Sequence, residues 1–367
     1  MAKFQKIRTA GSIAGAAMGQ TNTITIQRQN RRLEKVLIQA RVTINTSGDR
    51  AAVTWDAAAY QERLTRIFSE VRLKVSDKAG NNRFVIKAPS ATLINWARKM
   101  GQNLGRYNKA ALSPSTTKNI AYDIFVPLFV RHPSMPDLVS NRTCIPLDAG
   151  SINDNVVIEL DTLAATPALF GCNGVTGGTT GVATITLNFI RYQIWYREMP
   201  ADVGYVPQEL ISQNITNVSA GMLRAQDIPR SGFLSSLLFE TFTDTGLTTV
   251  GDALSDSTVD FYRLYFGRKD IESFWQESEI EQDDNNGESQ SPTTTTVCIP
   301  NASGFMVDFL QDRSEEAGYA PDSLYNLYND NPGDTMKLEA TGVKANSVIR
   351  YTTHKFLTPD VTPLVGL

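Results

Sequence analysis

Residues 35–45 alternate between apolar and polar side chains, and this pattern constrains the fold more than any other feature of the chain. The apolar face holds Val36, Ile38, Ala40, Val42 and Ile44, and the polar face includes Lys35, Gln39, Arg41 and Thr43. A period of two over eleven residues predicts a strand that is buried on one face. Similar patterns predict further strands at 23–27, 68–75, 83–87, 122–130, 156–160, 184–197, 233–242, 261–266, 305–310, 336–340 and 348–356. We therefore expect an all-β fold with a few short inserted helices, one of them capped by Ser90.

The alternation within residues 184–197 changes phase partway along the segment. Ile185, Leu187 and Phe189 share one face, whereas Ile190 begins a second register that continues through Tyr192, Ile194 and Tyr196. Because side chains alternate with a period of two, one extra residue transfers the apolar set to the other face. The slip predicts a β-bulge, or the passage of this strand from one sheet to another.

The first 42 residues are basic in a chain that is slightly acidic overall. They carry eight basic side chains against Glu34, and because the whole chain has a formal net charge of −3, the remaining 325 residues carry −10. We expect residues 1–30, which contain Gly11, Gly15 and Gly19, to form an adaptable N-terminal arm. The arm would face nucleic acid or lipid headgroups, and a solvated tail is the equal alternative. The residues assigned to this inner-surface contact are Lys3, Lys6, Arg8, Arg28, Arg31 and Arg32.

Residues 270–288 are strongly acidic, with eight acidic and no basic side chains. A calcium loop with Gly287 at its sixth position would begin at Gln282 and end at Thr293, where carboxylates are required, so the segment is not an EF-hand. We expect a mobile loop between strands instead. Its exposed residues are predicted to be Asp283, Asp284, Asn285, Asn286, Gly287 and Glu288.

The sequence predicts no catalytic site, no metal site and no cofactor. Cys144, Cys172 and Cys298 are widely spaced, and the two histidines, His132 and His354, lie 222 positions apart. A zinc site needs closely spaced ligands, so we expect free thiols packed as small hydrophobic groups. His132 and Cys144 have no evident orienting partner for nucleophilic catalysis, and the GxSxG and HExxH motifs are absent. The sequence contains no apolar run of eighteen residues, so it predicts no membrane-spanning helix.

The two halves of the chain present similar elements in a similar order. Residues 35–45 correspond to 233–243, and residues 124–130 correspond to 305–310. The strands near Ile145 and Val156 would then correspond to those at Met336 and Val348, and the glycine-rich segment 165–181 separates the halves. We expect an arm at 1–30, a first domain at 31–182 and a second at 183–367. Eight strands in two sheets, as in a jelly roll, would suit each domain.

Three segments resemble the double jelly-roll major capsid proteins of the tectivirus–adenovirus lineage, which includes tailless icosahedral bacteriophages. They are IFVPLFVRHPSMPDL at 124–138, YQIWYREMPADVGYVP at 192–207 and GFLSSLLFETFTDTG at 232–246. The resemblance implies a structural protein of the virion, forming homotrimers of hexagonal outline that tile an icosahedral shell around the genome. Implied partners are neighbouring trimers, penton or minor capsid proteins and, through the arm, packaged nucleic acid or the lipid of an internal membrane. Assembly in the host cytoplasm is expected.

Two other classes of protein compete with the capsid interpretation. A β-sandwich spike protein could bind a receptor or carbohydrate through Trp55, Trp96, Trp195 and Trp275. We expect these tryptophans to fill cores or subunit contacts instead, and a free lectin has no need of a basic arm. An enzyme of the cupin type would need a cluster of metal-binding histidines, which two distant histidines do not supply.

Overall fold

The computed structural model describes residues 6–47, 64–100, 118–131, 141–170, 181–198, 204–216, 221–228, 231–242, 261–266, 269–275, 304–308, 325–326, 336–343 and 348–358. The strands of the first half are β1 (Lys6–Ser12), β2 (Thr21–Ile26), β3 (Arg32–Ser47), β4 (Phe68–Ser76), β5 (Asn82–Ala88), β6 (Lys118–Phe129), β7 (Ile145–Pro146), β8 (Val156–Thr162) and β9 (Gly181–Arg197). Those of the second half are β10 (Gln208–Thr216), β11 (Gly221–Asp227), β12 (Phe233–Phe242), β13 (Phe261–Phe266), β14 (Lys269–Trp275), β15 (Gly304–Asp308), β16 (Tyr325–Asn326), β17 (Met336–Val343) and β18 (Val348–Phe356). Among these residues the helices are α2 (Ser90–Lys99) and three short 3₁₀ turns, η1 (Thr65–Ile67), η2 (Asn141–Thr143) and η3 (Pro167–Phe170). The expected all-β fold is confirmed.

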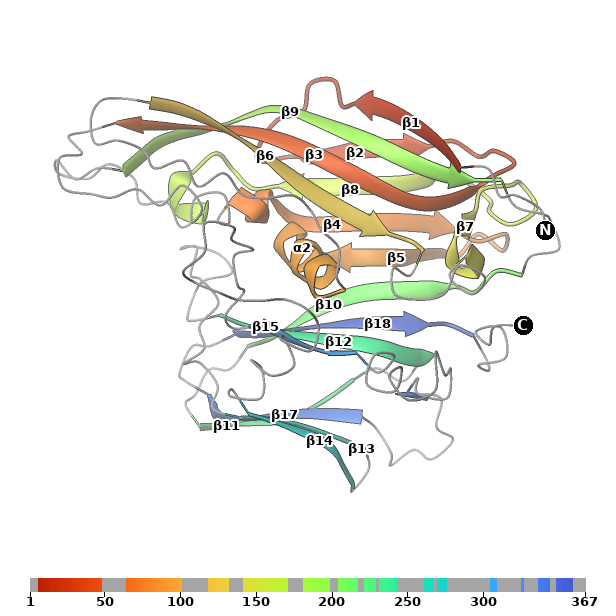
Figure 1. Ribbon diagram of the computed structural model, residues 1–367, viewed down its shortest axis with the longest axis vertical. Helices are drawn as coiled ribbons and strands as arrows, with labels where there is room; N and C mark the ends of the chain where they lie inside the picture. The colour runs from red at the N-terminus through yellow and green to blue at the C-terminus, as the bar shows by residue number, and fades with distance from the viewer. Residues whose placement is uncertain are drawn as a thin grey trace.

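The strands form three sheets, and the largest extends along the long axis of the molecule (Figure 1). The first has the order β1-β9-β3-β6, with β7 beside β3, and the last has the order β11-β17-β13-β14. Between them lies a nine-stranded sheet, β15-β12-β18-β10-β5-β4-β8-β2, with β16 beside β12. Four strands of this central sheet come from the first half of the chain and five, including β16, from the second, so that one sheet belongs to both jelly rolls.

The second half repeats the strand order of the first. Adding nine to each strand number converts β1-β9-β3-β6 into β10-β18-β12-β15, and β2-β8-β4-β5 into β11-β17-β13-β14. Even the two-residue strands agree, because β7 lies beside β3 and β16 lies beside β12. Each half therefore has eight principal strands in two four-stranded sheets, which is the predicted pair of tandem jelly rolls.

The expected boundary between the two halves does not coincide with the end of a strand. β9 pairs with β3 along its whole length and with β1 over residues 191–197, so the boundary expected after residue 182 falls inside a strand of the first jelly roll. The strand at Met336 is consequently the counterpart of the one at Val156, and Val348 begins the counterpart of β9. We propose that the division between the halves lies between Arg197 and Gln208.

The predicted phase change in the strand around 184–197 is a β-bulge. Arg41 pairs with Phe189 while Val42 pairs with Leu187, which leaves Asn188 as the extra residue of β9. Ile185 and Ile190 are both buried on the core side as a result. Phe189 instead shares the outer face with Arg41, since the slip occurs one residue earlier than the sequence suggested.

Most of the expected N-terminal arm is part of the fold, which corrects the prediction for residues 1–30. β1 pairs with the last seven residues of β9, and β2 pairs with β8 with its side chains alternately exposed and buried. The glycines that indicated flexibility have local roles instead. Gly15 has a positive φ of 67° in the turn between the two strands, and Gly11 leaves space for the Tyr192 ring, which a Cβ would approach to 2.5 Å.

Candidate functional site

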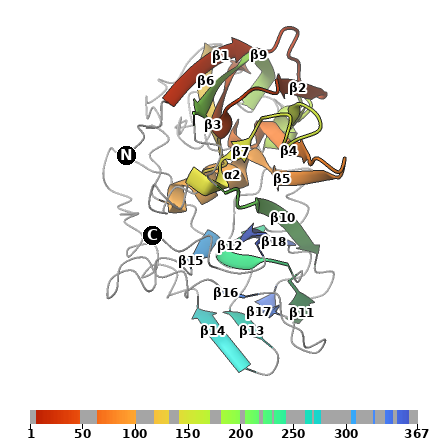
Figure 2. The same cartoon turned by 90° about the vertical axis from the view of Figure 1, so that its right-hand side faces the viewer.

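The junction between the two jelly rolls is where their sheets become continuous. β5 of the first half and β10 of the second pair in parallel, with Leu210 opposite Ile86 and Ile211 opposite Lys87. Helix α2 lies beside this join, against β4 and β6, and reaches across toward the second half (Figures 1 and 2). The junction is thus built from both hydrogen-bonded strands and a bridging helix.

Helix α2 forms because residues 90–99 place their apolar side chains on one buried stripe. Leu93, Ile94, Trp96 and Ala97 are all buried. The cap differs from the prediction: Pro89, with an extended backbone, is the N-cap, and Ser90 lies inside the helix. The Ser90 hydroxyl donates a hydrogen bond to the carbonyl of Thr65 and so ties the helix to the turn η1.

A buried carboxylate connects the helix to the second jelly roll. Glu240 on β12 accepts hydrogen bonds from Thr92 Oγ1 and Asn95 Nδ2, each at 2.6 Å. Arg350 on β18 donates to Thr92 Oγ1 at 3.0 Å and to Asn214 Oδ1 at 3.0 Å, and its Nη1 lies 3.8 Å from Glu240 Oε2. Glu240 is 1% exposed and Arg350 is 6% exposed. Burial lowers the pKa of Arg350, and the charge of Glu240 opposes this shift.

A histidine occupies the adjacent part of the junction. His354 on β18 shares a hydrogen bond through Nδ1 with Ser235 Oγ, and its Nε2 lies 2.9 Å from Gln208 Oε1. The ring of Trp96 lies 5.5 Å from that of His354, and its indole Nε1 donates to Ser236 Oγ at 3.3 Å. In hydrolytic triads the serine bonds to Nε2 and faces substrate, whereas here it bonds to Nδ1 and is fully buried. This arrangement aligns strands with the helix.

The polar groups of the junction restrict how the two halves can be oriented. Each buried donor or acceptor needs a partner in a defined direction, and leaving one unpaired costs about 1–3 kcal/mol. Thr92, Asn95 and Trp96 come from the first half, and Glu240, Ser236 and Arg350 come from the second. A rotation of one jelly roll against the other would break several of these bonds together.

The sequence indicated none of the junction pairs, although it contained a signal for them. Glu240 stands in the apolar segment 233–242 and Arg350 in the segment 348–356, both predicted as strands. A charged side chain within an apolar strand is seldom buried without a partner. The sequence shows that each charge needs a partner, but only the fold shows that they lie beside one another.

The structure brings most of the predicted basic residues to one end of the first jelly roll. Lys6 and Arg32 both pair in register with Arg197, and Arg28 and Arg31 lie in the connection from β2 to β3. The guanidinium groups make local contacts: Arg28 with Asn153 O at 2.9 Å, Arg31 with Glu198 at 3.5 Å and Arg32 with Gly204 O at 3.1 Å. Arg8 lies further along β1, over the ring of Trp195. Lys3 lies outside the described residues.

Several other predicted residues also lie outside the described part of the chain. Among them are the residues predicted to form an exposed acidic loop, Asp283, Asp284, Asn285, Asn286, Gly287 and Glu288, and also Trp55, His132, Cys172 and Cys298. In sequence this loop falls between β14 and β15, the position that corresponds to the α2-containing connection between β5 and β6. Trp96 is buried in the junction, as expected for a core tryptophan, and Trp195 is partly exposed.

The described residues also bear on the thiol, metal and membrane predictions. Cys144 is a buried free thiol, as predicted, and burial raises its pKa to about 12. The described ranges contain no group of three or more His, Cys, Asp and Glu side chains placed to hold a metal ion. Within those ranges, no helix has the length and apolar character needed to cross a membrane.

Solved structures with this arrangement of strands come from viral capsids. The major capsid protein of Sulfolobus turreted icosahedral virus matches over 100% of both chains, with a TM-score of 0.64 and 12% identity. The major capsid protein P2 of bacteriophage PM2 matches over 96% of this chain and 99% of its own, with a TM-score of 0.55 and 12% identity. The chain has the fold of double jelly-roll major capsid proteins. The PBCV-1 virus capsid supplies a third match, with a TM-score of 0.57 and 11% identity over 96% of this chain and 94% of that one.

Solved structures reveal relatives of this chain that sequence comparison does not. No protein-family model matches the sequence, and no curated protein matches it either. The resemblance noted at residues 124–138, 192–207 and 232–246 is nevertheless confirmed at the level of the fold. These segments contain the second half of β6, the last six residues of β9 and all of β12.

Proposed function

We propose that this protein is a structural major capsid protein that forms homotrimers, and that these trimers tile an icosahedral shell around a genome. The observation that carries the proposal is the repeated strand order, in which each strand of the first jelly roll has a counterpart nine strands later. Two similar barrels per chain make six around a threefold axis. Such a ring fills a sixfold lattice position with three identical subunits and closed symmetry.

The fused junction supports this role rather than an enzymatic one. A lattice subunit must hold its two barrels at a fixed angle, and the continuous central sheet with the Glu240 and Arg350 contacts provides that rigidity. The polar cluster most similar to a catalytic site, Ser235 with His354, is buried. We therefore assign the protein no catalytic activity. Its place is the capsid of the virion, in contact with neighbouring trimers and with penton or minor capsid proteins.

We also propose that the basic end of the first jelly roll faces the shell interior. Lys6, Arg31 and Arg32 are brought together there by the strand register, and Lys3 precedes them in sequence. Packaged nucleic acid or the headgroups of an internal membrane would supply the anionic surface, to which each basic side chain contributes about 1 kcal/mol near lipid.

Light scattering of the purified chain tests the proposal. A homotrimer of the 40.4 kDa chain has a mass of about 121 kDa, and we expect this species at micromolar concentration. A monomer that persists throughout the concentration series would contradict the proposed function. A Lys3→Glu/Arg31→Glu variant should still form the trimer but should assemble fewer particles or enclose less nucleic acid or lipid. Normal particles with normal contents would rule out the interior role of this end.

A further inference from the structure

The two outer faces of the first jelly roll have contrasting side chains. On the β2-β8-β4-β5 sheet the charges are paired. Arg72 lies 2.8 Å from Glu70, 2.7 Å from Glu159 and 2.8 Å from Asp161, and Lys74 lies 2.5 Å from Glu159. The edge strand β2 adds exposed Thr21, Thr23 and Thr25, which are uncharged. This face has the character of a solvated surface.

The outer face of the β1-β9-β3-β6 sheet combines aromatic rings with basic groups. At one end, Arg8 lies 5.7 Å and Lys35 lies 4.6 Å from the centre of the Trp195 ring, and Lys35 is also 5.8 Å from Phe129. Near the middle of the sheet, Arg41 and Arg191 lie 5.4 and 4.2 Å from the centre of the Phe189 ring. These four basic side chains share the face with one carboxylate, that of Asp123, which lies 2.6 Å from Arg41.

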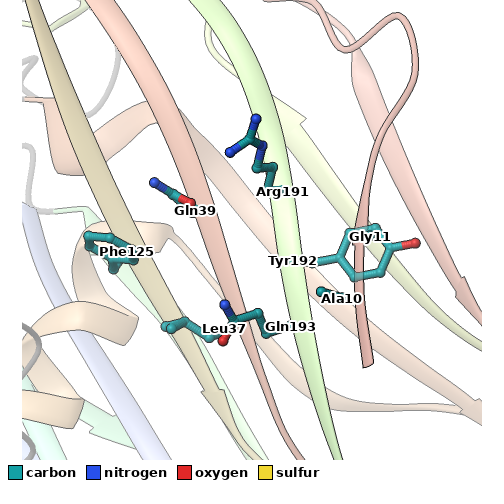
Figure 3. A pocket seen from close by; sticks show the side chains of 8 residues that line it. All are labelled: Ala10, Gly11, Leu37, Gln39, Phe125, Arg191, Tyr192 and Gln193. Atoms are coloured by element: carbon teal, nitrogen blue, oxygen red, sulfur yellow. The ribbon is translucent and has the colours of Figure 1, made fainter. Parts of the chain in front are cut away.

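A hollow of about 260 Å³ lies between these two groups of residues (Figure 3). Its floor and walls include Leu37 on β3, Phe125 on β6 and Tyr192 on β9, and Arg191 stands at its rim. Gln39 and Gln193 add polar groups that can donate and accept hydrogen bonds. Ala10 on the edge strand β1 is exposed and borders the opening. A partly exposed apolar centre with Arg and aromatic side chains around it is the composition of a protein–protein contact.

We propose that this outer face is a contact surface for a second copy of the same chain. The inference rests on the proposed capsid function and specifies which surface makes the contact. The partner copy has the complementary charge, because the chain outside residues 1–42 carries a net charge of −10. The basic groups of the face then meet carboxylates of the neighbour, and an apolar side chain of the neighbour enters the hollow.

Nucleic acid fits this face less well than a second copy does. A strand of phosphates needs several uncompensated basic groups in a row. Arg41 is already paired with Asp123, whose carboxylate would repel phosphate, and Lys35 is half-buried over two rings. The exposed basic groups of the face, Arg8 and Arg191, are offset by four residues along the strands, about 13 Å, because Arg191 pairs with Ser12.

Two substitutions on this face, each with a matched control, test the proposal in the full-length chain. Ala10→Trp fills the mouth of the hollow, and Thr23→Trp places the same ring at an exposed position on the other edge strand. Arg8→Gln/Arg191→Gln removes two positive charges, and Thr23→Glu/Thr25→Glu changes the net charge equally on the opposite face. Circular dichroism confirms that each variant is folded, and light scattering with electron microscopy gives the concentration at which half of the chain is assembled.

We expect both face variants to raise this half-assembly concentration at least about tenfold, and both controls to leave it within about twofold of the wild type. Loss of trimers and loss of particles from intact trimers both support a contact between copies. If the wild type forms trimers and particles and the face variants assemble equally well, this inference is wrong, whereas the proposed capsid function is unaffected. A wild type that never assembles would remove the proposed function itself. Normal assembly with lost binding of a single-stranded DNA oligonucleotide would assign the face to nucleic acid and overturn the proposal.

Discussion

The two jelly rolls share a strand order but differ in strand length and burial. β3 and β9 have 16 and 17 residues, whereas their counterparts β12 and β18 have 10 and 9. In β2 exposed and buried residues alternate, as expected for a strand with one solvated face, whereas all nine residues of β18 are buried. The topology is repeated while the environment of each sheet is not.

The difference follows from where each sheet lies. The β10-β18-β12-β15 sheet continues the central sheet and lies between the first jelly roll and the β11-β17-β13-β14 sheet (Figures 1 and 2). Its polar side chains, such as Glu240 and His354, are therefore enclosed and must find partners across the junction. Corresponding positions of the first half can instead face solvent or another molecule. The fused sheet thus encloses one sheet of the second jelly roll, while the corresponding sheet of the first keeps an outer face.

Removing the buried carboxylate should have the largest effect. Glu240→Ala leaves Arg350 buried without its acidic partner, which costs about 3–5 kcal/mol of unfolding free energy. Asp123→Ala, which breaks the more exposed pair with Arg41, is the control and should cost about 1 kcal/mol or less. Urea unfolding measures both. Equal losses in the two variants would show that the junction is no more demanding than the outer face.

A backbone position in the second jelly roll should be the next most sensitive. Gly232, just before β12, has a φ of 75°, and an added Cβ would lie 2.3 Å from the carbonyl oxygen of Phe356. Gly232→Ala therefore combines backbone strain with a clash against the neighbouring strand, and we expect a loss of about 2–3 kcal/mol. Gly15→Ala has similar strain with nothing within 4 Å, so about 1 kcal/mol is expected. Thermal unfolding that ranks Gly15→Ala above Gly232→Ala would contradict the close packing of these strands.

Removing one carboxylate from the ion pairs on the outer face of β4 and β8 should have the smallest effect on the free energy of unfolding. The hydrogen bond from Lys74, together with Arg72, lowers the pKa of Glu159 below its ordinary value of 4.5. Because the pKa of Glu159 is lower in the folded state, its ionised carboxylate stabilises the fold at pH values above the ordinary pKa. This stability is lost as the pH falls through the folded-state pKa. Glu159→Gln should therefore reduce stability near neutral pH by about 1 kcal/mol or less and flatten the acid dependence. Unfolding curves with the same acid dependence as the wild type would exclude this contribution.

The sequence predicted the strands better than it predicted their partners. The alternation at 35–45 identifies β3 and its buried face, because a period of two is a local property. The phase change near Phe189 revealed a bulge in β9 but not the sheet that contains the strand, so the boundary expected after residue 182 divides β9 near its start. Gly11 suggested flexibility because the Tyr192 ring that needs its space is 181 residues away in sequence. The contacts of Glu240 and Arg350 join residues that are far apart in sequence, and so do the contacts between basic groups and aromatic rings on the outer face of the β1-β9-β3-β6 sheet. No local pattern encodes such pairings.

An electron micrograph of the assembled protein tests the central claim most directly. The central claim is our proposal that this double jelly roll, whose two halves share one sheet, forms six-lobed trimers that tile a closed shell. Purified assemblies should therefore show icosahedral particles whose surface units have a hexagonal outline, each made of three chains. Filaments, isolated monomers, or rings with a number of chains other than three would contradict it.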